Sequence, residues 1–538
     1  MKGLKVQLPS AVTDNTLRKL EHYVGIEFER GASNGGGDNG YHQMIGDESL
    51  LKEMRFHNEM KTAMVKNAAI TEVLNQVNWN KTQDGGASVI DGSDGSDILN
   101  VFDRTIYAIL GGTNAKYERF IVSDEPFSYD GDVAVAITPF GECPDYATVL
   151  NNKLRSIRND GVSGTQGTSY GTSFSSDVYG NGKAGGYPRT NLNRFQYEAY
   201  ARANNDDKNS NLPYTIVTNQ EIELAQALMF IEFRTKNLNA CLGHGLSSNA
   251  SPTSANWGKV TGVRYSPSND GNYVYAPLNR TVYVNGNNAL NFWQIINNNC
   301  PLLKIFEAQL AVSNGDSLEA VTDADGNPVQ GIADGVMTGI WTKRFTFQVN
   351  AATTNGGEAN NWTVEVVFRV PIWRGRTRLW GHLSQWHGGY EILNWFDGTT
   401  THHKLFRARS VADLTTDSDT AAKASAGLFS FEKTYEDLGE MPTCGTSSTT
   451  NWAKEQMCTK KGITTAIGGK TGGNMGTHEN AVVGIAGLSQ EGQYTRCGSH
   501  LGGVANYGNA VLRWAFCHYA PSYAYTFCGS GFRVEISA

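Results

Sequence analysis

The sequence predicts an α+β protein in which short strands and long irregular loops outnumber helices. Glycine is abundant at 60 residues, proline is sparse at 14, and charged residues make up only 18% of the chain. Because 40% of the residues are hydrophobic and 11 are tryptophan, the chain can fill cores, so it is a turn-rich globular protein and not a disordered one. Its 538 residues suffice for two to four domains, or for one large domain with appendages.

Charge and composition exclude several classes of function. The formal net charge is −7 and no basic stripe stands out, which argues against nucleic-acid binding. The first residues contain no apolar stretch typical of a signal peptide, and no run approaches the length of a membrane span. We therefore expect a protein made in the cytoplasm and not exported by the general route. The eight cysteines include no CxxC pair, so we expect no zinc site and free thiols.

The N-terminal region mixes short apolar alternation with the flexible tract at 31–40. Residues 47–77 lack proline and glycine and are rich in helix formers, which predicts one or two helices. Such helices would serve either packing or attachment and oligomerisation. We assign residues 1–75 to a small, partly helical region of this kind.

A β-rich connecting region is predicted over 76–190. Residues 79–97 are rich in turn formers, 98–110 are strand-like, and 132–140 alternate as a strand does. The Gly/Ser/Asn-rich tract at 159–187 predicts a long surface loop.

A buried helix is predicted to begin after Thr218, which forms a capping-box pattern with Glu221. Its apolar run continues to about Asn237, and Gly243 and Gly245 are suited to end it.

The rest of the 191–538 region is predicted to be mainly β. Hairpin-like segments follow the helix at 263–284, 318–333 and 362–373. Five tryptophans between 362 and 395 predict a compact irregular core and not regular stacked strands. At the C-terminus, 532–537 alternate as a closing strand with Phe532, Val534 and Ile536 inward.

Several motifs fail their chemical requirements. Residues 467–473 lack the spacing of a phosphate loop, so we interpret them as a glycine turn. The acidic stretches 91–97 and 323–328 fail the EF-hand pattern and are interpreted as turns joining strands, with a structural calcium loop of another type left open.

The histidines and the adjacent Cys517 and His518 also lack the arrangement of a metal site or a catalytic pair. His382 with His387 and the adjacent His402 and His403 lack the spacing of a helical metal pair. Cys517 and His518 are adjacent and would face opposite ways in a strand, which argues against a nucleophile–base pair. We therefore predict no metal and no catalytic residue.

The stretch from Cys497 to Phe532 is the most informative part of the chain. It contains one formal charge, Arg513, and no acid. Between Tyr519 and Cys528 the rings occupy odd positions and small residues occupy even ones, so an extended strand would carry rings on one face. Rings beside Ser, Gly and Asn are the chemistry of a binding surface. An ordinary core strand is the alternative, although three tyrosine hydroxyls would then need buried partners.

These C-terminal residues carry a family resemblance. Gly498-Ser499-His500, Ala520-Pro521-Ser522 and Gly531-Phe532-Arg533 resemble the variable region of variable proteins made by diversity-generating retroelements. Those proteins have a C-type-lectin fold of the formylglycine-generating-enzyme type. Upstream, 193–195, 231–233 and the WRG…GH…DG pattern between Trp373 and Gly398 resemble the same family, and 82–95 resemble phage tail proteins with this fold. The resemblance covers about residues 76–538.

The resemblance implies a set of diversified, ligand-binding positions, each reachable from an asparagine codon by changing its adenines. These positions are His500, Leu501, Gly502, Val504, Asn506, Tyr507, Asn509, Val511, Ala515, Cys517, His518, Tyr519, Tyr523, Tyr525 and Phe527. The expected Trp shortly after Gly498-Ser499 is missing, and Gly529-Ser530 lengthen the approach to Gly531. Cys517 is then one sampled variant, and the low charge follows because such codon changes make no Lys or Glu.

The resemblance also implies a function. It predicts a phage tail receptor-binding protein, made in the host cytoplasm and carried on the virion. Residues 191–538 would form a C-type-lectin-like domain, with a variable region at 497–533 that binds a bacterial surface protein or glycan. A homotrimer, contacts with other tail proteins, no nucleic acid and no membrane insertion are implied. Two alternatives stay open: an enzyme of the formylglycine-generating type using a pair among Cys497, Cys517 and Cys528, and a purely structural virion component.

Overall fold

The fold is described from a computed structural model, within which strands dominate and helices are few. The described residues are 22–29, 42–54, 60–76, 79, 81–90, 92, 94–150, 152–156, 192–205, 214–236, 238–242, 263–266, 274–276, 281–284, 288–291, 317–329, 338–349, 362–376, 378, 384–396, 399, 401–408, 435–440, 450–458, 464–471, 480–483, 494–501, 515–516 and 528–536. The helices in these ranges are α2 (Ser49–Glu53), α4 (Arg194–Arg202), α5 (Asn219–Phe233) and α6 (Leu238–Leu242). The α+β class with strands dominant is thus confirmed.

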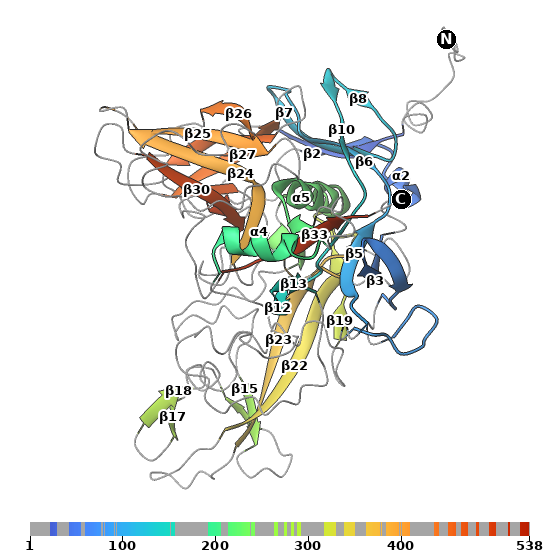
Figure 1. The fold of residues 1–538 in the computed structure, drawn as a ribbon, viewed down its shortest axis with the longest axis vertical. Coiled ribbons are helices and arrows are strands. Elements are labelled where there is room, and N and C mark those ends of the chain that lie inside the picture. Colours follow the sequence, from blue (N-terminus) through green and yellow to red (C-terminus); the bar gives the residue numbers. More distant parts are fainter. Residues whose placement is uncertain are drawn as a thin grey trace.

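Two sheets lie around the central helix α5 (Figure 1). The first has five strands in the order β10 (Val135–Ile137), β6 (Ile106–Gly111), β7 (Tyr117–Ser123), β1 (Val24–Glu29) and β2 (His42–Gly46). The second has six strands in the order β14 (Thr215–Ile216), β33 (Phe532–Glu535), β11 (Phe140–Glu142), β5 (Asp97–Phe102), β3 (Lys61–Lys66) and β4 (Ala69–Val73). Strands from both ends of the chain therefore meet in the six-stranded sheet.

Two further large sheets extend away from α5 (Figure 1). A five-stranded sheet has the order β16 (Val274–Ala276), β15 (Val263–Ser266), β23 (Trp362–Ile372), β22 (Gly339–Val349) and β19 (Ser317–Glu319). A nine-stranded sheet follows the path β26 (Tyr435–Glu440), β25 (Thr401–Ala408), β24 (Ser384–Phe396), β30 (Tyr494–Leu501), β31 (Ala515–Phe516), β29 (Asn480–Val483), β27 (Thr450–Cys458) and β28 (Thr464–Thr471), and β32 (Cys528–Gly529) pairs with β24 beside this path.

Four small hairpins complete the described strands. They are β8 (Ser128–Tyr129) with β9 (Asp132–Val133), β12 (Thr148–Leu150) with β13 (Lys153–Arg155), β17 (Thr281–Val284) with β18 (Asn288–Asn291), and β20 (Val321–Thr322) with β21 (Pro328–Val329).

Helix α5 begins where the capping-box pattern predicts. The backbone N–H of Thr218 donates to the Glu221 carboxylate at 2.8 Å, which satisfies an N-terminal donor of the helix. As predicted, the helix is buried on most sides. It ends at Phe233 and not near Asn237, because Arg234 takes a left-handed conformation with φ 54°.

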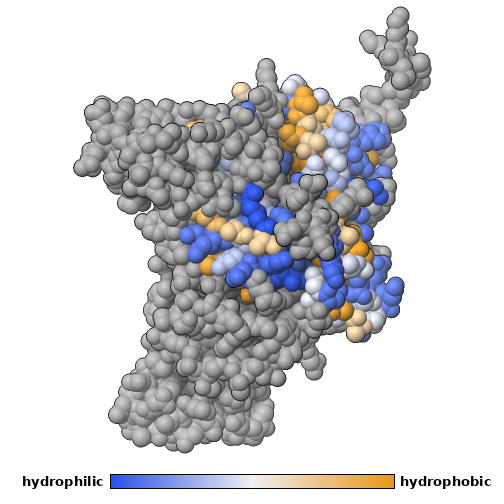
Figure 2. All heavy atoms as spheres, viewed as in Figure 1, coloured by the Kyte–Doolittle hydropathy of each residue, from blue (hydrophilic) through white to orange (hydrophobic). Residues whose placement is uncertain are grey.

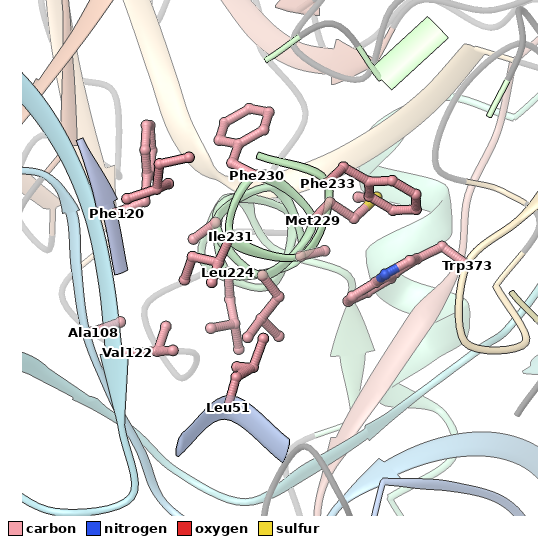
Figure 3. Packing of buried hydrophobic residues seen from close by; sticks show 14 of the residues in the cluster. Leu51, Ala108, Phe120, Val122, Leu224, Met229, Phe230, Ile231, Phe233 and Trp373 are labelled. Atoms are coloured by element: carbon pink, nitrogen blue, oxygen red, sulfur yellow. The ribbon is translucent and has the colours of Figure 1, made fainter. Parts of the chain in front are cut away.

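One side of α5 packs mainly by apolar contacts. Val24, Ile26, Phe120 and Val122 alternate along β1 and β7, as a strand with one face on a core requires. The Phe230 ring of α5 lies 4.9 Å from the Phe120 ring, centroid to centroid, in an edge-to-face arrangement. Figure 3 shows Phe120 and Val122 on one side of the helix and Trp373 on another.

The outer face of this sheet carries a small satellite cluster. Ile45, Ile109 and Ile121 are buried there beneath partly buried aromatic side chains, and Val133 is 57% exposed. Figure 2 shows the corresponding apolar patch near β8 and β10.

The six-stranded sheet separates two kinds of packing. Leu99, Val101, Phe532 and Val534 face the apolar cluster that includes Tyr197 of α4. The other face carries polar side chains, such as Asn100, Glu142 and Arg533, beside the stacked rings of Phe102 and Phe140. The closing strand is confirmed, because Phe532, Val534 and Ile536 are all buried and share the apolar face.

The helices predicted over 47–77 are wrong for 60–76, while α2 lies within the range and 55–59 fall outside the described residues. Strands β3 and β4 instead form an antiparallel hairpin joined by Asn67 and Ala68, whose φ values are 50° and 62°. Two consecutive positive φ values characterise the tight hairpin turn whose twist suits paired strands. The many Lys, Met and Ala residues suggest a helix, but β-branched residues recur through both strands, and pairing with β5 buries β3.

Two other interpretations need correction. Four of the five tryptophans do not mark an irregular core: Trp362 lies in β23, Trp386 and Trp395 lie in the long strand β24, and Trp373 directly follows β23. Trp380 lies outside the described residues. The supposed glycine turn at 467–473 is strand up to Thr471, with Gly469 opposite Ala453 of β27.

Other segments fulfil their predictions wholly or in part. Residues 98–110 lie within β5, β6 and the link between them. The stretch 132–140 is extended but broken into β9, β10 and the start of β11, and Pro139, which lacks an N–H, stands at the last break. The acidic turn 323–328 joins β20 to β21, with the Asp323 carboxylate accepting from the Asn327 N–H at 2.8 Å. The predicted loop at 159–187 lies outside the described residues.

Candidate functional site

Three of the predicted ligand-binding positions lie in described strands and come together. His500 and Leu501 end β30, and Ala515 begins β31. Leu501 is directly opposite Ala515, and His500 is opposite Phe516. Strands β24 and β31 flank β30 at this point, so the backbone at His500 and Leu501 is held from both sides.

The other predicted positions lie outside the described residues. They are Gly502, Val504, Asn506, Tyr507, Asn509, Val511, Cys517, His518, Tyr519, Tyr523, Tyr525 and Phe527. The candidate binding segment is defined below as residues 502–527, which lie between the described ends β30 and β32.

Both ends of the candidate binding segment attach to one residue of β24. Gln385 pairs with Leu501 in the antiparallel register and with Gly529 in the parallel register. Adjacent strands lie about 4.8 Å apart, so the chain leaves and returns on opposite sides of β24 with its ends roughly 10 Å apart. The described strands β30 and β32 therefore enclose a narrow base on β24, from which segment 502–527 begins and to which it returns.

A buried guanidinium, that of Arg378, forms hydrogen bonds at this base. Arg378 is fully buried and donates from Nε to the Cys143 carbonyl at 2.7 Å and from Nη1 to the Gln385 Oε1 at 3.1 Å. It also forms an ion pair with Glu142 of β11. Because β11 belongs to the six-stranded sheet, Arg378 links that sheet to the strand that holds both segment ends.

The returning chain is fastened a second time after β32. The Ser530 hydroxyl donates to the Trp386 carbonyl at 2.8 Å, and the Ala147 N–H donates to the Ser530 carbonyl at 2.9 Å. The Val217 N–H donates to the Gly531 carbonyl at 3.2 Å. Ser530, which lengthens the approach to Gly531, therefore helps to hold this base. We call the residues that hold it, Glu142, Arg378, Gln385 and Ser530, the frame.

Each residue of the Gly531-Phe532-Arg533 motif has a structural role. A Cβ at Gly531 would lie 3.1 Å from Arg378 Nε and 3.3 Å from Val217 Cγ2, so only glycine fits without displacing a neighbour. Phe532 is buried in the apolar cluster of the six-stranded sheet. Arg533 points the other way and pairs with Glu221 of α5 at 3.1 Å.

The Trp373-Arg374-Gly375 motif is a tight turn. Trp373 and Arg376 exchange backbone hydrogen bonds of 3.1 and 2.9 Å, and Arg374 and Gly375 have φ values of 48° and 75°. The Trp373 indole N–H donates to the Glu232 carboxylate of α5 at 2.8 Å. The turn thus presents its arginines to the polar side of α5.

Burial strongly affects the arginines of this turn. Desolvation lowers the pKa of Arg374 and of Arg376 to about 10, although Glu232 and Glu142 favour their charged forms. Arg376 lies 2.5 Å from Glu142 and stacks over the Phe102 ring at 4.8 Å from its centroid. Both arginines are charged at neutral pH, so the acids beside them are obligatory partners.

Within the described residues no metal cluster is found, and the Cys143 thiol is buried. Within them, no three His, Cys, Asp or Glu side chains gather as a metal site, and no helix is long and apolar enough to span a membrane. Burial raises the pKa of the Cys143 thiol to about 12. His387 is buried in β24.

Sequence reasoning missed the residues that build the frame. Glu142, Arg378 and Gln385 carry no local motif, and Glu142 and Arg378 are separated by 236 positions. The one usable signal is the alternation of Arg374, Arg376 and Arg378 beside tryptophans, because arginines in an apolar setting require buried acids.

Comparison with protein-family models and with curated proteins gives no match for this chain. The resemblance to retroelement variable proteins therefore stays a prediction carried by the motifs themselves.

Proposed function

We propose that this chain is a phage tail receptor-binding protein that holds a diversified segment on a rigid C-type-lectin-like scaffold. The observation that carries the proposal is the base of segment 502–527, whose two ends pair with Gln385. A segment whose flanking strands are fixed can change its side chains while its backbone start and finish stay in place.

The composition of the segment suits binding. Tyr519, Tyr523, Tyr525 and Phe527 provide large, rigid side chains with few rotatable bonds, as binding loops commonly do. Hot spots of interfaces concentrate in such aromatic residues. A homotrimer would present several copies to a bacterial surface protein or glycan and would add avidity.

Frame and proposed variable positions are largely separate in sequence. Glu142, Arg378, Gln385 and Ser530 hold the base, and none of them belongs to the proposed diversified set. Variation in the segment would therefore leave the base contacts intact.

The register of the strands speaks against one version of the enzyme alternative. Cys497 pairs with Ile392, whereas Cys528 pairs with Ser384. Cys497 and Leu501 are four positions apart along β30, which corresponds to about 13 Å, and a cysteine pair needs Cα atoms within about 7 Å. A neighbouring Cys497–Cys528 pair is thus incompatible with this pairing.

Binding of the labelled full-length protein to bacterial cells tests the proposal. Tyr519→Ala, Tyr523→Ala and Tyr525→Ala each remove one ring. Binding is measured on the bacterial strain that the wild-type protein binds best, and we expect at least one variant to bind these cells with at least tenfold lower apparent affinity than wild type. Ser522→Ala, Ala524→Ser and Thr526→Ser are matched controls on the small-residue positions and should bind like wild type. Equal binding by all six variants would contradict the proposal. A deletion of 497–533 that lowers the yield of virions but leaves the host range of the assembled virions unchanged would favour the structural alternative.

A further inference from the structure

Arg378 contacts the six-stranded sheet, β24 and Gly531 at the base of the candidate binding segment. Its guanidinium contacts Glu142 and the Cys143 carbonyl on the six-stranded sheet and Gln385 on β24. Its side chain also lies against Gly531, where an added Cβ would come within 3.1 Å of Nε. One side chain therefore meets the strand that pairs with both segment ends and the residue that follows the returning end.

The geometry of the guanidinium explains why this position requires arginine. Three different nitrogens reach three acceptors, which a planar fork with fixed donors can do and a single ammonium cannot. The side chain is fully buried, so no water competes for these bonds.

The fold does not depend on Arg378 alone for charge balance. Glu142 is also paired with Arg376, whose Nη2 lies 2.5 Å from the other carboxylate oxygen. Removing Arg378 therefore leaves Glu142 with a cationic partner, and the six-stranded sheet retains its apolar face.

We propose that Arg378 is a positioning residue for the binding segment: by holding Gln385 against β11 and packing on Gly531, it fixes the spacing and direction of both segment ends. This inference rests on the proposed function for its biological meaning, and on the contacts above for its mechanism. It predicts that the contribution of Arg378 to binding does not depend on which side chains occupy the segment.

Hydrogen exchange of the full-length protein separates positioning from charge compensation. Arg378→Lys keeps the charge beside Glu142 and removes the fork, and Arg378→Met removes both. We expect both variants to exchange at least tenfold faster than wild type in peptides covering 494–501 and 528–533. If Arg378 only compensates charge, Arg378→Lys will exchange as wild type does, and the proposal is overturned.

Arg119→Lys is the matched control. Arg119 is also buried and pairs with Glu27 at 3.0 Å and with Asp130, but in the five-stranded sheet beside α5. Arg119→Lys should leave hydrogen exchange at 494–501 and 528–533 unchanged, and equal acceleration in both lysine variants would also overturn the proposal.

If the Arg378 variants fail to fold, Gln385→Leu provides a second test. It removes only the link between Arg378 and β24 and should accelerate exchange in the same peptides. Exchange at the wild-type rate in Gln385→Leu would contradict the proposal.

Cell binding by the same variants decides the proposed function separately. Faster exchange at the base together with at least tenfold weaker binding supports both ideas. Faster exchange with wild-type binding leaves Arg378 as a positioning residue and contradicts the role of segment 502–527 in binding.

Discussion

The two sides of helix α5 are held in different ways. Towards β1 and β7 the contacts are rings and aliphatic side chains, such as Phe230 on Phe120. Towards β33 and the Trp373 turn they are buried charges and hydrogen bonds, such as Glu221 with Arg533 and Glu232 with Trp373. Figure 3 shows Trp373 beside the helix on a different side from Phe120.

The two sides differ in how strictly their contacts fix the positions of the side chains. Apolar contacts are non-directional and tolerate replacement by side chains of similar volume. A buried ion pair is weak as a source of net stability, but it fails badly when one partner is lost or displaced. The polar side of α5 is also the side that leads through β33 and Gly531 to the base of the candidate binding segment. We infer that the exact positions of the side chains matter most on this polar side of α5.

Breaking the buried ion pair should give the largest effect. Arg533→Met leaves the Glu221 carboxylate buried without its partner, and we expect a loss of about 3–5 kcal/mol in the free energy of unfolding, measured by urea denaturation. Met229→Leu on the apolar side keeps volume and should cost less than about 1.5 kcal/mol.

The double variant Glu221→Gln/Arg533→Met sharpens this test. It removes the stranded charge and should recover part of the loss, because neutral partners avoid the desolvation cost. If Arg533→Met costs no more than Met229→Leu, the two sides of α5 do not differ as described.

Adding one methyl group at Gly531 should give the next largest effect. Gly531→Ala places a Cβ against Arg378 and Val217, so we expect a loss of about 1–3 kcal/mol from overpacking. Calorimetric unfolding measures it. Gly86→Ala is the control, because there the only close neighbours are the exposed-turn side-chain atoms of Thr82, and its cost should be smaller.

Removing the helix cap should give a smaller effect. Thr218→Ala takes away the threonine half of the capping box with Glu221, and we expect a loss of about 1 kcal/mol in urea denaturation. The substitution leaves the carboxylate of Glu221 on Arg533. A loss as large as that of Arg533→Met would show that the cap, and not the ion pair, dominates this end of α5.

The smallest effect concerns reactivity and not stability. Burial raises the pKa of the Cys143 thiol to about 12, so at pH 8 the folded protein holds almost no Cys143 thiolate. Iodoacetamide at pH 8 should modify Cys143 only after unfolding, as peptide mass spectrometry will show, whereas the less buried Cys241 should react sooner. Rapid modification of Cys143 in the folded state would mean that the sheet beneath the segment is open to solvent.

Local patterns in the sequence predicted local structure well. The capping box at Thr218 and Glu221 and the inward residues of the closing strand depend on neighbours in the chain, and the structure confirms them. The hairpin of β3 and β4 was missed because its composition favours helix, and only pairing with β5 decides against it.

The frame of the candidate site could not be predicted in the same way. Arg378 meets residues 7 and 236 positions away, and no local pattern records such pairs. The motifs at Trp373 and Gly531 marked the right regions, but their roles as a tight turn and a close contact follow only from the fold.

Sequencing the gene in independent isolates tests the central claim most directly. We predict that substitutions gather at the fifteen proposed positions between His500 and Phe527, that Arg378, Gln385 and Gly531 do not change, and that a near-copy of the 497–533 coding segment, differing mainly at adenines, lies beside a reverse transcriptase gene. Substitutions spread evenly along the chain, with the frame residues as variable as the segment, would contradict it.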